Sequence, residues 1–167
     1  TTEQGSEMIS KASFEAAWNS LEQKGIITVN ELPHEARYRS TAICAILARL
    51  PYVEYTTYPK TTLFLTSHCF SNQELSETFK VGTQRGIRVA GRSPDTKQVV
   101  FITVSASDYN VDHPYQDRWK GEHFYYTGEG LLGDQEMTQG NLALQRSIEA
   151  DYPVYGFRKL RTGSYSY

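Results

Sequence analysis

The spacing of apolar residues changes after about the first third of this 167-residue chain. Before position 51 the apolar side chains recur three or four residues apart, as Phe14, Trp18 and Leu21 do, and this is the period of a helix buried on one face. Beyond position 51, short runs of β-branched and aromatic residues alternate with glycine and proline turns, a pattern typical of strands. The length permits one well-cored domain or two small ones. We therefore expect an α+β protein whose two parts differ in architecture.

The first part, residues 8–66, predicts a winged helix-turn-helix. A helix is expected to begin with Ser13 as its N-cap and to end at Gly25. Helical spacing predicts a second helix over 42–50, and two strand-like runs joined by a Pro-Lys tip predict a hairpin over 52–66. Helix, turn, helix and hairpin in this order are typical of a winged helix, which can place its second helix in a DNA groove.

Three basic residues of this part are candidate DNA contacts: Arg37 and Arg39 at the start of the second helix, and Lys60 at the tip of the hairpin. Residues 1–79, however, hold 6 basic and 9 acidic side chains, a net charge of −3. Such a charge disfavours contact with the phosphate backbone of DNA. The sequence therefore leaves two roles open for this part, contact with DNA or contact with another protein.

A polar connector is expected over residues 67–78, followed by a β-rich domain over 79–162. Its expected strands cover 86–89, 99–104, 124–127 and 153–158, and one helix is expected over 141–150. The chain ends in Tyr-Ser-Tyr without a recognisable closing element. We therefore expect that the sequence is part of a longer chain.

Catalytic and metal-binding classes find little support in the sequence. Two cysteines, Cys44 and Cys69, cannot build a disulfide framework, and His113 and His123 lack partners at the spacing of a zinc site. The oxygen-rich stretch 108–112 lacks the glycine and the terminal glutamate of a calcium loop. No phosphate loop or nucleophile motif is complete. We expect a protein that is not a catalyst by itself and that needs no cofactor or metal.

The hydropathy pattern predicts a soluble protein. The apolar runs are shorter than the roughly 18 residues that span a bilayer, and the amino end is polar. The formal net charge is −2, so a general excess of basic residues does not identify a nucleic-acid binder. We expect a cytoplasmic location.

A set of short blocks in the second part resembles one family. In chain order these are Arg85-Gly-Ile-Arg88, Tyr115-Gln-Asp-Arg-Trp119, Phe124-Tyr-Tyr-Thr-Gly-Glu-Gly130, Gly133-Asp-Gln, Gly140-Asn-Leu-Ala-Leu144 and Pro153-Val154. Together they resemble the SRA (SET- and RING-associated) domains, including relatives in bacterial modification-dependent restriction systems. The resemblance implies a twisted β-barrel with one or two helices that reads chemically modified DNA. A nucleoid-associated location and a nuclease domain or subunit as partner would follow.

The resemblance also implies a pocket for a modified nucleotide. Tyr115 and Asp117 match the pocket loop of the family, and Tyr126 and Thr127 match its stacking turn. A base that is turned out of the duplex needs aromatic faces to replace its lost stacking, and a carboxylate can accept from the N4 amine of cytosine. Gly128 allows a tight turn and a close approach of the backbone.

Several alternatives stay open at the pocket. The spacing of Tyr109 and Asp112 also fits the pocket loop, although the later pair needs fewer inserted residues before Tyr126. Trp119 either fills the gap left by an extruded base or belongs to the core. Tyr126 either stacks on a base or is a core residue of the barrel.

Residues 80–125 have a local charge of +2, and their cations are candidates for contact with DNA phosphates. These candidates are Arg85, Arg88, Arg92, Arg118 and Lys120. The partner is expected to be duplex DNA that carries 5-methylcytosine, a hydroxymethyl or glucosylated derivative, or a backbone phosphorothioate. A phosphorothioate would suit a surface cavity lined by Tyr152, Pro153 and the Tyr115 loop. A protein-interaction adaptor built on DNA-binding folds is the alternative function.

Overall fold

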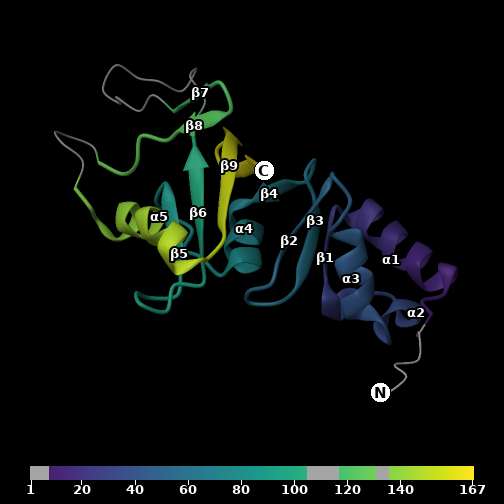
Figure 1. Ribbon diagram of the computed structural model, residues 1–167. Helices are drawn as coiled ribbons and strands as arrows, with labels where there is room; N and C mark the ends of the chain where they lie inside the picture. Colours follow the sequence, from purple (N-terminus) through teal and green to yellow (C-terminus); the bar gives the residue numbers. More distant parts are fainter. Residues whose placement is uncertain (1–7, 105–116, 131–135) are drawn as a thin grey trace. The chain divides into compact units, whose positions relative to one another are not determined.

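The computed structural model describes residues 8–104, 117–130 and 136–167. The chain divides into two compact units, Thr1–His68 and Cys69–Tyr167 (Figure 1). The observed class is α+β, as predicted.

The first unit combines helices with a small antiparallel sheet. Its elements are α1 (Lys11–Lys24), β1 (Ile26–Thr28), the 3-10 helix η1 (Val29–Glu31), α2 (His34–Arg37), α3 (Ser40–Leu47), β2 (Val53–Thr56) and β3 (Thr62–Leu65). The strands are arranged in the order β1-β3-β2. The hairpin predicted over 52–66 is confirmed, since β2 and β3 pair from Val53 opposite Leu65 to Thr56 opposite Thr62.

The first helix is bounded by two residues of contrasting backbone geometry. Gly25 ends it in the left-handed conformation, at φ 76°, as predicted. The predicted N-cap was wrong, because Ser10 rather than Ser13 caps the helix. The Ser10 hydroxyl accepts from the backbone N–H of Ser13 at 3.0 Å and so satisfies one of the first free donors of the helix.

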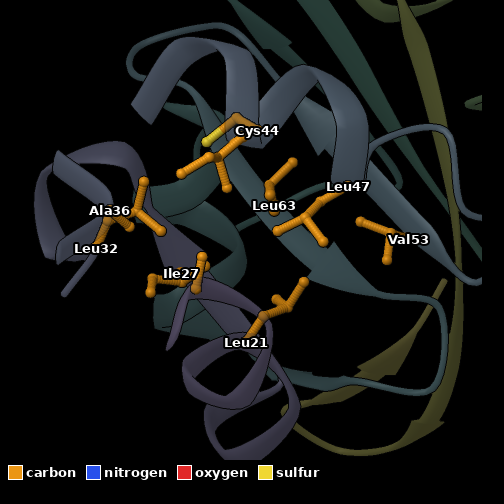
Figure 2. Packing of buried hydrophobic residues seen from close by; sticks show 10 residues of the cluster. Leu21, Ile27, Leu32, Ala36, Cys44, Leu47, Val53 and Leu63 are labelled. Carbon is orange, nitrogen blue, oxygen red and sulfur yellow. The ribbon is translucent and has the colours of Figure 1, made fainter. Parts of the chain in front are cut away.

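The core of the first unit lies between its helices and its sheet. Figure 2 shows Leu21 of α1, Ile27 of β1, Leu47 of α3 and Leu63 of β3 directed into one cluster. Each of these four side chains is at most 1% exposed. Burial of an aliphatic side chain of this size contributes about 1.5–3 kcal/mol, so these contacts contribute strongly to the stability of the unit.

The second unit is built on an open five-stranded sheet. Its elements are β4 (Cys69–Ser71), α4 (Asn72–Phe79), β5 (Ile87–Ala90), β6 (Gln98–Thr103), β7 (Arg118–Lys120), β8 (His123–Tyr125), α5 (Gln139–Ala150), β9 (Val154–Arg161) and β10 (Ser164–Ser166). The sheet order is β4-β10-β9-β6-β5, with β6 and β9 parallel, and β7 and β8 form a separate hairpin. Within the described ranges the strands do not close into the barrel that the resemblance implied.

The segment expected to be a connector instead belongs to the second unit. Its residues form β4 and α4, and α4 begins with a capping box in which Ser71 and Glu74 satisfy each other's backbone N–H groups. Phe70, Leu75 and Phe79 are fully buried. Their burial outweighs the polar character of the intervening residues, which was the basis of the wrong prediction.

The two faces of the large sheet are covered by different helices. On one face, Phe79 of α4 packs against Tyr155 and Phe157 of β9, with ring centroids 4.8 and 5.3 Å apart. On the other face, Ala143 of α5 packs against Ile87 of β5 and neighbouring strand residues. Because successive side chains of a strand point to opposite faces, β5 contributes Ile87 to the α5 side and the next residue to the α4 side.

Candidate functional site

The turn Tyr126–Gly130 is the centre of the candidate site. Gly128 has a φ of 80°, a left-handed conformation that glycine adopts without strain. The Glu129 carboxylate accepts from the backbone N–H of Ile87 at 2.8 Å and fastens the turn to the beginning of β5.

Asn141 fastens the same turn to α5. Its Oδ1 accepts from the backbone N–H of Glu129 at 2.8 Å, and its Nδ2 donates to the carbonyls of Glu129 at 2.9 Å and Glu136 at 2.8 Å. The side chain thus uses three of its four hydrogen-bonding positions on the backbone around the turn. The Gly-Asn block predicted from the sequence therefore has a structural role, and Glu129 is a positioning residue that the sequence did not reveal.

Asp117 and Thr127 lie together, as the pocket prediction requires. Oδ1 of Asp117 accepts from the backbone N–H of Thr127 at 2.9 Å. Within the described residues Oδ2 of Asp117 forms no hydrogen bond with a protein donor, so it is available to a ligand. Tyr115 lies outside the described residues, as do the alternatives Tyr109 and Asp112.

Tyr126 is half-buried and joins the core to the site. Its ring lies 5.0 Å from that of Phe101, and it packs against the cluster under α5. A Cβ placed on Gly86 would lie 3.1 Å from the Tyr126 hydroxyl oxygen, so the ring reaches the start of β5. Both alternatives predicted for Tyr126 thus retain support, because one part of the ring is packed and the other is accessible.

The β7–β8 hairpin carries an exposed indole. Trp119 is 69% exposed, which excludes the alternative that it belongs to the core. Its ring packs at 5.2 Å on Phe124, which in turn stacks on Phe101 at 6.0 Å. The hairpin lies beyond the carboxyl end of β6 (Figure 1), so these rings form a continuous row from the core to the surface.

The cations of the hairpin lie on its other face. Arg118 pairs with Tyr125 and Lys120 with His123 across the two strands, and the Arg118 guanidinium lies 5.9 Å from the centre of the Tyr125 ring. All four residues are exposed. The hairpin therefore presents one cationic face and one aromatic face.

A cavity of about 870 Å³ opens beside β5 and α5. Arg85, Arg88 and Arg92, three of the predicted phosphate contacts, line it together with Arg146 and Tyr152. Burial raises the pKa of the Tyr152 hydroxyl, which donates to the carbonyl of Ala143. Arg146 was missed because its position on α5 separates it by more than 50 residues from the other arginines.

Comparison with family models identifies the second unit. The model described as "ScoMcrA-like, SRA domain" matches residues 68–167. The chain belongs to this family. The resemblance drawn from the sequence blocks is thereby confirmed, and the matched range of the SRA domain agrees with the second unit of the fold. Neither the curated proteins nor the solved structures gave a match.

Membership of the SRA family assigns a coarse function to this unit. SRA domains are DNA-binding modules that recognise modified DNA, so recognition of modified DNA is indicated for the second unit. The first unit lies outside the SRA match.

The predicted DNA contacts of the first unit occupy separate positions. Arg37, at the end of α2, donates from Nε to the carbonyl of Leu32 at 3.1 Å. The Arg39 guanidinium lies 4.6 Å from the centre of the Tyr38 ring at the start of α3. Lys60 is exposed between β2 and β3. Arg37 and Arg39 thus have intramolecular contacts beside the expected recognition helix.

Metal-binding clusters and membrane-spanning helices are both absent from the described residues. Groups of three or more His, Cys, Asp or Glu side chains arranged to hold a metal ion were not found there. The helices in the same ranges are too short or too polar to cross a membrane.

Proposed function

We propose that the SRA unit recognises a modified cytosine base that is turned out of duplex DNA. The observation that carries the proposal is the hydrogen bond between Asp117 and the backbone of Thr127, because it joins two sequence blocks that are ten residues apart and holds the carboxylate against the residue that follows Tyr126. A carboxylate accepts from the N4 amine of cytosine, and an aromatic ring replaces lost base stacking at about 1–3 kcal/mol per base.

Trp119 is the side chain that we propose enters the duplex where the base has left. Two observations support this proposal: the Trp119 side chain is 69% exposed, and its ring packs on Phe124, which stacks on Phe101. Turning out a base costs a few kcal/mol, and an inserted apolar side chain offsets part of this cost by restoring contact with the neighbouring bases. Arg118 and Lys120 on the opposite face of the hairpin would then contact the backbone phosphates.

Binding titrations on matched duplexes test the proposal. Wild-type protein is titrated with duplexes that are identical except for one unmodified cytosine, 5-methylcytosine, 5-hydroxymethylcytosine, glucosylated cytosine or a backbone phosphorothioate. We expect preference for one of the base modifications, accompanied by a rise in fluorescence of a 2-aminopurine placed beside the modified base. Equal affinity for all duplexes would overturn the reading of DNA modification, and preference for the phosphorothioate alone would overturn the base pocket.

Two variants of one residue test the position of the pocket. Tyr126→Ala removes the ring and should abolish the preference for modified DNA while leaving salt-dependent binding to plain DNA largely intact. Tyr126→Phe keeps the ring and should retain the preference, which makes it the matched control. An unchanged preference in Tyr126→Ala would show that the base binds elsewhere.

For the first unit we propose a winged helix that contacts a protein partner. The order of helices and strands and the sheet order β1-β3-β2 support the winged helix. The first unit holds 6 basic and 7 acidic side chains, a net charge of −1, so it lacks the basic surplus of a DNA-binding surface, and this favours a protein partner such as a nuclease subunit of a restriction system. Lys60→Ala should then leave DNA affinity unchanged at low salt. A several-fold loss would instead support DNA binding by the hairpin.

A further inference from the structure

The cavity beside β5 and α5 has an unusual charge. Four arginines line it, namely Arg85, Arg88, Arg92 and Arg146, and none of the described residues that line it is acidic. In the described part of the chain, none of these four guanidinium groups forms an ion pair with a carboxylate. The cavity therefore has a concentrated positive potential inside a unit that has no overall basic excess.

Arg88 adds a buried charge next to the cavity, since it is only 5% exposed and its side chain lies on the α4 face of the sheet. Its hydrogen bonds go to neutral acceptors, which are the carbonyl of Arg85 at 3.2 Å, Oδ1 of Asn72 at 2.8 Å and the hydroxyl of Tyr165 at 3.5 Å. A buried cation is costly unless an anion compensates it. Neutral acceptors on the α4 face satisfy the donors of Arg88 but leave its charge without a counter-ion, so this charge adds to the positive potential at the cavity.

The other arginines come from segments around the cavity. Arg85 has a left-handed backbone at φ 79°, a costly conformation for a residue with a side chain, and in it the Arg85 carbonyl reaches Arg88. Arg146 of α5 extends toward the loop after β5, where its Nη1 lies 3.4 Å from the Ser93 hydroxyl. Arg92 is exposed in the same loop. Guanidinium groups match the geometry of phosphate oxygens, and here several can approach one ligand from different sides.

The cavity adjoins the turn of the proposed base pocket. Arg85 and Ile87 line the cavity, and between them lies Gly86, where an added Cβ would lie 3.1 Å from the Tyr126 hydroxyl oxygen. Glu129 of the turn bonds to Ile87 and also lies against Gly140, another lining residue. A nucleotide held at Tyr126 would therefore have its own backbone close to the arginines.

We propose that this cavity binds backbone phosphates of the DNA strand that carries the modified base. The proposal rests on the function proposed above for the choice of strand, but phosphate binding itself requires no modification. The cavity thus supplies affinity and orientation, whereas the pocket at Tyr126 supplies discrimination.

The test measures how DNA affinity depends on salt. The full chain and the variants Arg85→Ala, Arg92→Ala and Arg146→Ala are titrated with modified and unmodified duplexes between 50 and 200 mM salt. Each lost phosphate contact should reduce the slope of log K against log salt by about 1, which means that the affinity lost over this salt range becomes roughly 3- to 4-fold smaller. Both duplexes should be affected equally, so the preference remains. Arg161→Ala, an exposed arginine outside the cavity, is the matched control and should keep the wild-type slope.

The outcomes separate this proposal from the previous one. If wild-type protein shows no preference for modified DNA but the cavity variants have a reduced salt dependence of DNA affinity, the base pocket is refuted and the phosphate cavity is retained. Unchanged slopes in all three variants would overturn the cavity assignment even if the preference exists. Calorimetric titration with inorganic pyrophosphate tests whether a free phosphate compound occupies the cavity instead. If the variants lose pyrophosphate binding but keep the wild-type salt dependence of DNA affinity, the occupant is a free phosphate compound and the assignment to DNA is overturned. Arg88 is left intact because its burial makes a folding defect the expected result.

Discussion

Asn141→Asp tests whether the three hydrogen bonds from the Asn141 side chain to the backbone around the turn determine the geometry of the site. The substitution keeps the size of the side chain and the acceptor for the Glu129 N–H, but it converts two donated hydrogen bonds into contacts between a carboxylate oxygen and the carbonyls of Glu129 and Glu136. Each lost hydrogen bond costs about 0.5–1.5 kcal/mol, and the repulsion between oxygens adds to this cost. We expect a loss of about 2 kcal/mol in the free energy of unfolding.

For a unit of this size, such a loss lowers the melting temperature by roughly 8–16 °C. Differential scanning calorimetry of the full chain measures this shift, and titration with modified and plain duplexes measures the preference, which should fall because the turn holding Tyr126 is released. Asn19→Asp, an exposed residue of α1, is the control for the added charge. If Asn141→Asp has the melting temperature of the control and keeps the wild-type preference for modified DNA, the hydrogen bonds of Asn141 do not determine the geometry of the site.

Two further predictions concern packing and pH. Gly156→Ala would place a Cβ 2.7 Å from Cζ of Phe101 and should lower the free energy of unfolding, measured by calorimetry, by about 1–3 kcal/mol. Gly82→Ala is the control, because a Cβ there would meet open space and should not destabilise the chain. Equal stability of the two variants would contradict close packing at Gly156. Hydrogen bonds from Thr28 lower the pKa of Glu31 from 4.5, so its stabilising contribution is present above the unfolded-state pKa and is lost as the pH falls through the folded-state value. Glu31→Gln should therefore be less stable than wild type by about 0.5 kcal/mol in urea unfolding at pH 7 and indistinguishable from it at pH 3, and a difference that does not change with pH would refute the role of the charge.

The elements that could be predicted from the sequence are those whose signals are local. Helix α1 ends at a glycine, and the β2–β3 hairpin has a short apolar run on each side of its tip, so both were recognised. The strand β10 was missed because its pattern, one buried tyrosine between two serines, is too short to be informative. Its stability comes from pairing with β4 and β9, which lie far away in the sequence. The chain end that lacked a recognisable closing element therefore forms a strand inside the large sheet.

Helix α4 was missed although a local signal was present. Ser71 and Glu74 stand at capping-box spacing, and Leu75 and Phe79 follow four residues apart, as on one helix face. The polar residues between them favoured a connector because only composition was weighed. Burial of Phe79 against the sheet, a tertiary contact, decides that this segment belongs to the second unit.

The sequence could suggest candidate site residues from their side-chain chemistry, but it could not show which residues hold the turn in place. Aromatic and acidic residues at the turn suggested contacts with a base, because their chemistry is visible in the side chain itself. The roles of Glu129 and Asn141 arise only from the fold, which brings β5 and α5 to the turn. Similarly, the arginines of the cavity are separate in the chain and acquire a shared role only when α5 carries Arg146 alongside β5.

The contacts divide the residues of the SRA unit into those that hold the turn and those that remain accessible to a ligand. The side chains of Asn141 and Glu129 form hydrogen bonds with backbone groups, so substitutions at these positions should lower stability together with any preference for modified DNA. Trp119 is mostly exposed and lacks such a holding role, so its removal should alter DNA binding with little change in stability. Asp117 belongs to both groups, since one oxygen holds Thr127 and the other faces outward from that bond. Asp117→Asn separates its two roles: the amide oxygen can still accept from Thr127, whereas the N4 amine of a cytosine would meet an amide donor, so preference should be lost while the melting temperature stays near that of the wild type.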